Sequence, residues 1–153
     1  MGGEDRLQEL GIQLPTPPQP LASYVPVSVS SGYAYVSGQV PIAEGKPLWT
    51  GKLGDGVDVA AGAEAARRCV LQALSALRAE LGSLDRVKRI VKLGVFVASA
   101  AGFTGQPKVA NGASDVLVEV FGDSGRHART AVGVAELPLG APVEVDIVAE
   151  IVP

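Results

Sequence analysis

Residues 57–81 read VDVAAGAEAARRCVLQALSALRAEL and carry the strongest helix pattern in the chain. Asp58 is a suitable N-cap for a helix, and Gly82 is a suitable residue to end it. Apolar residues recur at steps of three and four, the spacing of the buried face of an amphipathic helix: Val59, Ala63, Ala66, Val70, Leu74, Leu77 and Leu81. The stretch therefore predicts one long helix whose apolar face packs on the core.

Downstream of this helix the chain alternates between strand and helix patterns. Residues 87–98 are rich in β-branched side chains and predict a strand. Residues 107–121 carry apolar side chains at near-helical spacing, with Pro107 acceptable in the first turn, and predict a second helix. Residues 129–136 and 143–152 alternate in character and are joined by a turn-like Leu-Pro-Leu-Gly, so they predict two final strands.

Upstream, residues 23–42 predict a β-hairpin, because Tyr and Val residues alternate on either side of a Ser-Ser-Gly turn signal. Residues 41–56 hold several Gly and Pro residues and predict a loop. Residues 1–20 combine a short helix pattern with four prolines, and we treat them as an N-terminal arm before a single domain of residues 21–153. The predicted element order is ββαβαββ, an α+β fold with two helices packed on one face of a mixed sheet.

Length and composition limit the possible functions. The 153 residues suffice for one compact domain, and 47% hydrophobic against 19% charged residues excludes a disordered chain. A net charge of −3 without a dense basic run argues against nucleic-acid binding. One Cys and one His exclude an intrachain disulfide and a metal site with several His or Cys ligands. The chain has no signal-peptide pattern and no apolar run that could span a membrane, so we expect a cytoplasmic protein.

Alternation along the last two strands gives one candidate ligand site. Arg129 shares its side of the strand with small residues only: Ala131, Gly133 and Ala135. Glu144 and Asp146 share one side of the last strand, about 7 Å apart at Cβ. In one interpretation Arg129 binds a substrate carboxylate and Asp146 orients or activates a water molecule. In the other, Arg129 forms a structural salt bridge with one of these acids, which then face solvent at a sheet edge.

Two further residues with reactive side chains are expected to be inert. His127 lies in a predicted loop between Arg126 and Ala128 and is expected to be solvated. Cys69 lies beside the apolar stripe of the long helix and is expected to be a buried thiol. The run Gly-Asp-Ser-Gly at 122–125 lacks the lysine of a phosphate-binding loop and predicts a turn.

Three segments resemble motifs of the YjgF/YER057c/UK114 family, also called the RidA family: YAYVSGQVP at 33–41, ARTAVGVAELP at 128–138 and VEVDIVA at 143–149. The resemblance runs from about Pro20 to the C-terminus. The arm, with its LGIQLP stretch, is most similar to the longer branch labelled chorismate-mutase-like or endoribonuclease L-PSP. The resemblance implies a subunit of the bacillus-type chorismate-mutase-like fold that assembles as a homotrimer around a central barrel, with ligand sites between neighbouring subunits.

The best-characterised members of this family hydrolyse reactive enamines and imines, such as 2-aminoacrylate, to 2-keto acids and ammonia without a metal or cofactor. The resemblance therefore implies a hydrolase of the 2-iminobutanoate/2-iminopropanoate deaminase type. It assigns carboxylate binding to Arg129, and placement of the water to the backbone carbonyl of Ala131 and to Asp146. The same motifs imply four further substrate-binding positions: Tyr24, Ser37, Gly38 and Asn111.

The chain departs from the family pattern at two places. His127 replaces the proline that usually precedes the Ala-Arg pair, and Asp146 replaces a glutamate that is one methylene longer. The shorter acid favours an alternative function, a trimeric protein that binds small carboxylates without hydrolysing them. A third alternative, a ribonuclease or translation inhibitor, follows labels of some relatives. The charge of the chain and its single His argue against that third function.

Overall fold

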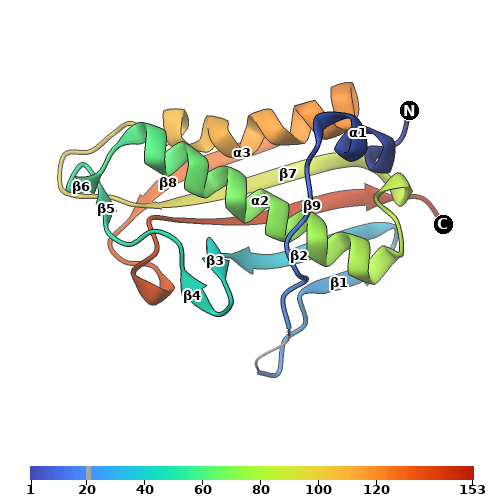
Figure 1. Cartoon of the computed structure of the whole chain (residues 1–153), viewed down its shortest axis with the longest axis horizontal. Coiled ribbons are helices and arrows are strands. Elements are labelled where there is room, and N and C mark those ends of the chain that lie inside the picture. The colour runs from blue at the N-terminus through green and yellow to red at the C-terminus, as the bar shows by residue number, and fades with distance from the viewer. Residues whose placement is uncertain (20–21) are drawn as a thin grey trace.

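The computed structural model describes residues 1–19 and 22–153, and a five-stranded mixed sheet forms one layer of it (Figure 1). The strand order is β1-β2-β9-β7-β8, in which only β7 and β8 pair in parallel. The strands are β1 (Val27–Ser30), β2 (Tyr33–Gln39), β7 (Val87–Ala98), β8 (Ala128–Val134) and β9 (Val143–Ile151). Since α3 connects the parallel pair, the predicted order ββαβαββ and the mixed sheet are confirmed.

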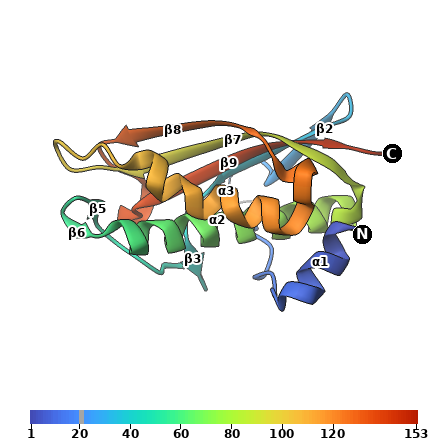
Figure 2. The same cartoon turned by 90° about the horizontal axis from the view of Figure 1, so that it is seen from above.

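In the described residues, three α-helices lie on one side of this sheet (Figure 2). They are α1 (Gly3–Leu10), α2 (Val59–Leu81) and α3 (Gln106–Phe121). The Asp58 carboxylate accepts a hydrogen bond of 2.8 Å from the Ala61 N–H and so caps α2, as predicted. Gly82 ends α2 with a left-handed φ of 85°, a conformation that glycine adopts without strain. None of the helices in the described residues combines the length and the apolar composition that crossing a membrane requires.

The two long helices approach each other closely at one glycine. A β-carbon at Gly112 of α3 would overlap the backbone carbonyl of Ala63 in α2. The absence of a side chain at this position therefore sets the distance between the helices. Below the helices, the inward side chains of the sheet complete the core, among them Leu93, Val95 and Ile147.

The opposite face of the sheet has no helix over it in the described part of the chain (Figure 2). Aromatic and aliphatic side chains nevertheless point to this side, among them Tyr33, Tyr35 and Val132, and Tyr35 is 49% exposed. We refer to this surface as the open face. An uncovered sheet face that carries tyrosines and aliphatic residues is typical of a contact surface.

The predicted loop 41–56 contains two short strand pairs. These are β3 (Ile42–Ala43) with β4 (Lys46–Pro47), and β5 (Lys52–Leu53) with β6 (Gly56–Val57). Gln72 of α2 fixes the start of this segment, because its amide donates to the Val40 carbonyl at 2.7 Å and accepts from the Ile42 N–H at 3.0 Å. The prediction of a loop missed these pairs because two-residue strands leave no periodic pattern.

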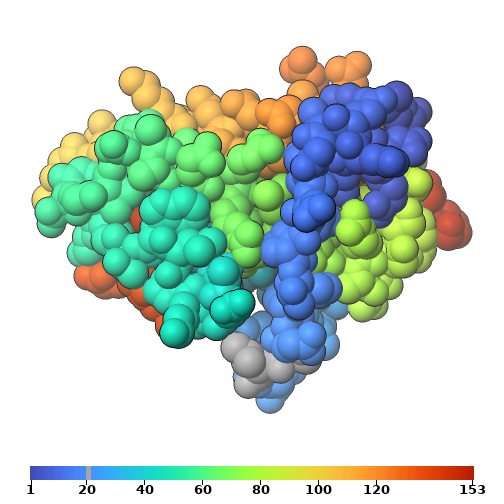
Figure 3. Space-filling view, in the orientation of Figure 1, coloured from blue at the N-terminus to red at the C-terminus, as the bar shows by residue number. Residues whose placement is uncertain are grey.

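The N-terminal arm packs on the domain and crosses the surface in front of α2 (Figure 3). Leu7 of α1 is buried in the core, and the Ser75 hydroxyl of α2 donates to the Pro15 carbonyl at 2.5 Å. The Glu4 carboxylate accepts hydrogen bonds from Arg78 at 2.8 and 3.1 Å and from the Leu84 N–H at 2.9 Å. Burial raises the pKa of Glu4, but these hydrogen bonds outweigh it and hold the pKa below its ordinary value. The predicted boundary between arm and domain, at residues 20 and 21, lies outside the described residues.

Candidate functional site

Arg129 lies in β8, at the edge of the sheet, and its side chain points to the helix side. This orientation follows from the register, because Arg129 pairs with Leu93 of β7, which is fully buried under the helices. The guanidinium contacts the first half of α3, from Pro107 to Ser114. Its Nη1 donates to Asn111 Oδ1 at 2.9 Å and to Ser114 Oγ at 3.1 Å, and its Nη2 donates to the Pro107 carbonyl at 3.4 Å. Arg129 and Asn111, both predicted as site residues, are therefore in contact.

All three acceptors of the Arg129 guanidinium are neutral. Within residues 1–19 and 22–153, no carboxylate lies within ion-pair distance of it. The alternative interpretation of Arg129, a salt bridge to Glu144 or Asp146, is wrong for a single chain, because those acids lie on the other side of the sheet. A half-buried cation without a counter-charge attracts an anion, so the geometry suits a small carboxylate ligand.

His127 and Ser114 extend this cluster. His127 Nε2 lies 2.9 Å from Ser114 Oγ, and His127 Nδ1 lies 2.6 Å from the Gly125 carbonyl oxygen. The expectation that His127 is solvated is therefore wrong, since both ring nitrogens bond to protein groups. Two sequence signals could have found this arrangement. His127 directly precedes β8 and is two residues from Arg129, a spacing that puts both side chains on one side of an extended chain, and Ser114 is three residues from Asn111 and shares its helix face.

The small residues beside Arg129 leave less room than the sequence suggested. A β-carbon at Gly133 would meet Gln106 Nε2 at 2.9 Å and Ser99 Oγ at 3.1 Å, so these polar groups already cover that end of β8. Ala131 is half-buried and packs against the core. Part of the row of small residues beside Arg129 therefore serves close packing of the start of α3, and any ligand space lies nearer to Arg129.

Two acids form a second cluster on the open face. Asp146 of β9 pairs with Gly94 of β7, and Glu144 lies beside Gly38 of β2. A β-carbon at Gly94 would overlap the Asp146 carboxylate, so this glycine gives the acid its place over the sheet. The expectation that these acids face solvent at an edge is wrong in one respect, because β9 lies between β2 and β7 in the interior of the sheet.

Both acids hold their protons more tightly than isolated carboxyl groups. Burial raises the pKa of Glu144 above its ordinary value, and the nearby Asp146 raises it further. Burial also raises the pKa of Asp146. A hydrogen bond from the Gly94 backbone N–H and the positive charge of Lys92 lower this pKa, but by less than burial raises it. A carboxyl group whose pKa is raised by burial holds and releases a proton at higher pH than a fully solvated one, which suits it to proton exchange with a nearby water molecule.

Replacing Glu144 with Gln is expected to raise the free energy of unfolding at neutral pH. The reason is linkage: a raised pKa means that the folded state binds the proton more tightly than the unfolded chain, so stability falls as pH rises through this pKa. The gain from Glu144→Gln should vanish below the ordinary pKa of 4.5, where both states are protonated. Urea unfolding across pH measures it, with the exposed Glu64→Gln as control. A gain that stays the same in acid would contradict the burial effect.

The remaining predicted residues lie along β2 and the segment before β1. The Ser37 hydroxyl donates to the Val25 carbonyl at 2.6 Å and so anchors the segment that carries the exposed Tyr24. Gly38 falls where the register between β2 and β9 shifts, and a β-carbon there would meet Glu144 Oε1 at 2.8 Å. Tyr24, Ser37 and Gly38 thus belong to the β2 side of the molecule, and no hydrogen bond among the described residues joins them to Arg129.

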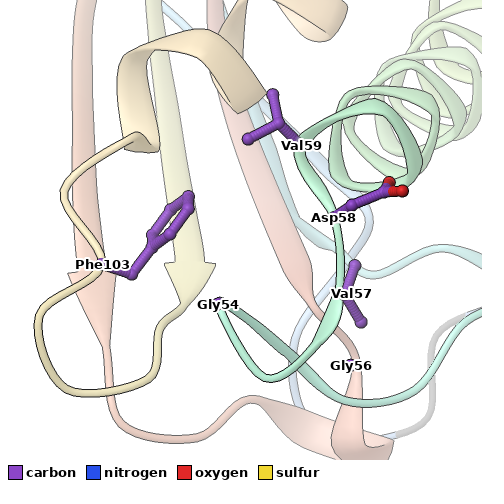
Figure 4. Close-up of a pocket in the computed structure, with 6 residues that line it drawn as sticks. All are labelled: Gly54, Gly56, Val57, Asp58, Val59 and Phe103. Atoms are coloured by element: carbon purple, nitrogen blue, oxygen red, sulfur yellow. The ribbon is translucent and has the colours of Figure 1, made fainter.

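A hollow of about 510 Å³ lies at the start of α2, between that helix and the loop before α3 (Figure 4). Its lining residues are Gly54, Gly56, Val57, Asp58, Val59 and Phe103. Asp58, the charged residue among them, is already used to cap α2. None of the residues that the sequence singled out for ligand binding lines this hollow, and it offers no group for the chemistry considered above.

The thiol of Cys69 lies under the strand that carries the acids, with its Sγ 3.6 Å from the Val143 carbonyl oxygen. Cys69 is buried as predicted, with burial raising the pKa of its thiol well above the ordinary value. Across the two described ranges, 1–19 and 22–153, no three His, Cys, Asp or Glu residues are grouped so that they could hold a metal ion. The candidate site therefore consists of the Arg129 cluster and the acid cluster, separated by the sheet.

Comparison with known proteins defines the class of protein. The model of the family described as "YjgF/chorismate mutase-like, putative endoribonuclease" matches residues 4–151, so the chain belongs to this family. Protein TCP17 of Trypanosoma cruzi is 53% identical over 146 residues, which cover 95% of this chain and 91% of TCP17.

Two solved structures extend the comparison. A protein of unknown function from Agrobacterium tumefaciens is 45% identical, with a TM-score of 0.90 over 99% of this chain and 94% of that one. The YjgF gene product of Escherichia coli is 25% identical, with a TM-score of 0.62 over 88% and 93% of the two chains. The chorismate-mutase-like fold expected from the motifs is thereby confirmed.

Proposed function

We propose that the protein hydrolyses small reactive 2-imino acids, and the enamines that tautomerise to them, to 2-keto acids and ammonia. The observation that carries this proposal is the Arg129 guanidinium, held by neutral acceptors at the sheet edge with its charge uncompensated by the described residues. A planar cation of this kind binds a carboxylate through two parallel hydrogen bonds. The motifs at 33–41, 128–138 and 143–149, which resemble those of imine-hydrolysing family members, support the same class of substrate.

The proposed reaction uses water as its only co-substrate. Water adds to the carbon of the C=N bond, a proton moves to nitrogen, the C–N bond breaks, and ammonia leaves while the carbon keeps the oxygen as a ketone. Arg129 would orient the substrate by its carboxylate. Asp146 and the backbone carbonyl of Ala131 would hold the water, and the raised pKa of Asp146 supports a role in proton exchange.

The site requires more than one copy of the chain. Arg129 and Asn111 lie on the helix side of the sheet and Asp146 on the open face, so one chain brings only half of the predicted residues together. We propose a homotrimer in which the open face of one subunit meets the β8 edge of the next. Exposed Tyr33, Tyr35 and Val132 support such a contact, and Tyr24, Ser37 and Gly38 would then line the shared cleft.

Release of 2-keto acid and ammonia tests this function. The substrate is 2-aminoacrylate generated in situ by a pyridoxal-phosphate lyase, followed by bulkier imino acids, and the protein is expected to accelerate hydrolysis over the rate without it. If hydrolysis is not accelerated but pyruvate binds by calorimetry, the protein is a carboxylate-binding protein, the alternative that the short Asp146 favours. If it neither accelerates hydrolysis nor binds a carboxylate, the proposal is wrong.

The endoribonuclease description of the family is not the function that we propose. A net charge of −3 disfavours binding to a phosphate backbone, and a chain with one His has no His pair for phosphodiester cleavage. We place the activity in the cytoplasm, where a reducing environment suits the single buried thiol of Cys69.

A further inference from the structure

We propose that Ser114 and His127 are positioning residues that orient the Arg129 guanidinium and select the edge with which it binds a carboxylate. The inference rests on the proposed carboxylate site, although not on hydrolysis. It starts from a continuous hydrogen-bond chain through three elements. The chain runs from the Gly125 carbonyl to His127, from His127 to Ser114 of α3, and from Ser114 to Arg129 of β8.

The direction of each hydrogen bond follows from the ends of this chain. The Gly125 carbonyl only accepts, so His127 Nδ1 carries the hydrogen, and Nε2 of the neutral ring is left as an acceptor. The Ser114 hydroxyl therefore donates to Nε2 and turns its lone pairs away from the ring. The Arg129 Nη1 donates into one of these lone pairs. Without His127, the hydroxyl hydrogen of Ser114 would be free to turn toward the cation.

The Gly125 carbonyl, where the hydrogen-bond chain begins, is held in place by packing. Gly125 is buried in the 3-10 turn η2 (Gly122–Gly125), and a β-carbon there would overlap the carbonyl of Leu117 in α3. The carbonyl that fixes the His127 ring is thus held directly against the helix that carries Ser114. The turn, the imidazole and the serine form one packed unit, and the guanidinium is aligned to it.

The hydrogens of Arg129 that already form hydrogen bonds determine which edge of the guanidinium is left to bind a carboxylate. Nη1 has two hydrogens, and both are used, one by Asn111 and one by Ser114. Nη2 gives one hydrogen to the Pro107 carbonyl, and no acceptor among the described residues bonds Nε. The hydrogens that remain belong to Nε and Nη2, which lie side by side on one edge of the guanidinium. With the Pro107 carbonyl on the Nη2 hydrogen that points away from Nε, a carboxylate binds this edge with both oxygens, whereas both hydrogens of Nη1 are already taken.

The test measures binding of pyruvate by calorimetry and imino acid hydrolysis in parallel. Ser114→Ala and His127→Phe are each expected to weaken pyruvate binding about 10-fold and to raise KM similarly, with kcat less affected. Ser114→Thr keeps the hydroxyl and His127→Gln keeps an acceptor, so both should bind within about 3-fold of the parent protein. Ser124→Ala, in the exposed part of η2, is the matched control.

A double variant of Ser114 and His127 distinguishes a positioning role from a general effect on folding, because it shows whether the two losses of pyruvate binding add. The double variant Ser114→Ala/His127→Phe is expected to match either single variant, because both act through one chain of hydrogen bonds. Nitrogen-15 spectra of the histidine should show the Nδ1–H tautomer. Additive losses, or pyruvate binding unchanged in both single variants, would overturn the proposal. A parent protein that binds pyruvate but does not hydrolyse imines would refute only the proposed catalysis, while a parent that binds no carboxylate would refute both.

Discussion

Arg129→Ala is expected to lower kcat/KM for 2-imino acid hydrolysis about 1000-fold. The substitution removes two charge-assisted hydrogen bonds to the substrate carboxylate, each worth roughly 2 kcal/mol, and about 1.4 kcal/mol corresponds to a factor of ten. Arg129→Lys should recover only a small part of the loss, because an ammonium group is a point charge and cannot offer two parallel donors on one edge. Release of keto acid at varied substrate concentration measures both variants.

A neighbouring arginine provides the control for this experiment. Arg126 pairs with Asp123 and has a 75% exposed side chain, so Arg126→Ala changes the same charge close to the site without touching the guanidinium of Arg129. It should retain the parent kcat/KM within about twofold. If Arg129→Ala is as active as Arg126→Ala, the carboxylate does not bind at Arg129.

Gly112→Ala is expected to destabilise the protein by about 3 kcal/mol and to lower Tm by roughly 8 °C. An alanine in a helix normally stabilises it by about 1 kcal/mol relative to glycine, so the predicted effect has the opposite sign to helix propensity. The cause is the close approach of α2 and α3, since the new β-carbon would overlap the Ala63 carbonyl. Thermal and urea unfolding measure the change.

The matched control for Gly112 is Ala79→Gly, on an exposed position of α2. It should show ordinary helix propensity, a loss of about 1 kcal/mol. A Gly112→Ala protein that is more stable than the parent would mean that the two helices separate at little cost, and that the observed contact does not hold the helices in place.

Local patterns predicted the main elements well. The strand at 87–98 has the bounds of β7, and the long helix begins two residues after the expected start, behind the Asp58 cap. Such patterns depend on neighbours within a few residues, and tertiary contacts here agree with them. The small strands β3 to β6 carry too few residues for any period to show.

The arrangement of the site could not be read in the same way. Alternation correctly predicted which residues of the same strand share a side with Arg129, and which share a side with Asp146. It does not show whether Arg129 and Asp146, on different strands, face the same side of the sheet. That relation is set by register: Leu93 pairs with both Arg129 and Ile147, which puts Arg129 on the side opposite Asp146. The position of α3 over β8, which brings Ser114 to His127, is likewise a result of packing between segments distant in sequence.

The position of β9 in the sheet determines when the sheet can be completed during protein synthesis. β9 is translated after the other four strands of this sheet, yet it occupies the middle, between β2 and β7. Until it leaves the ribosome, the hairpin β1–β2 and the unit β7–α3–β8 share no sheet hydrogen bonds, and each exposes an unpaired strand edge. The nascent chain thus depends on β9 to join these two units, so premature termination before β9 would release fragments with open strand edges that favour aggregation.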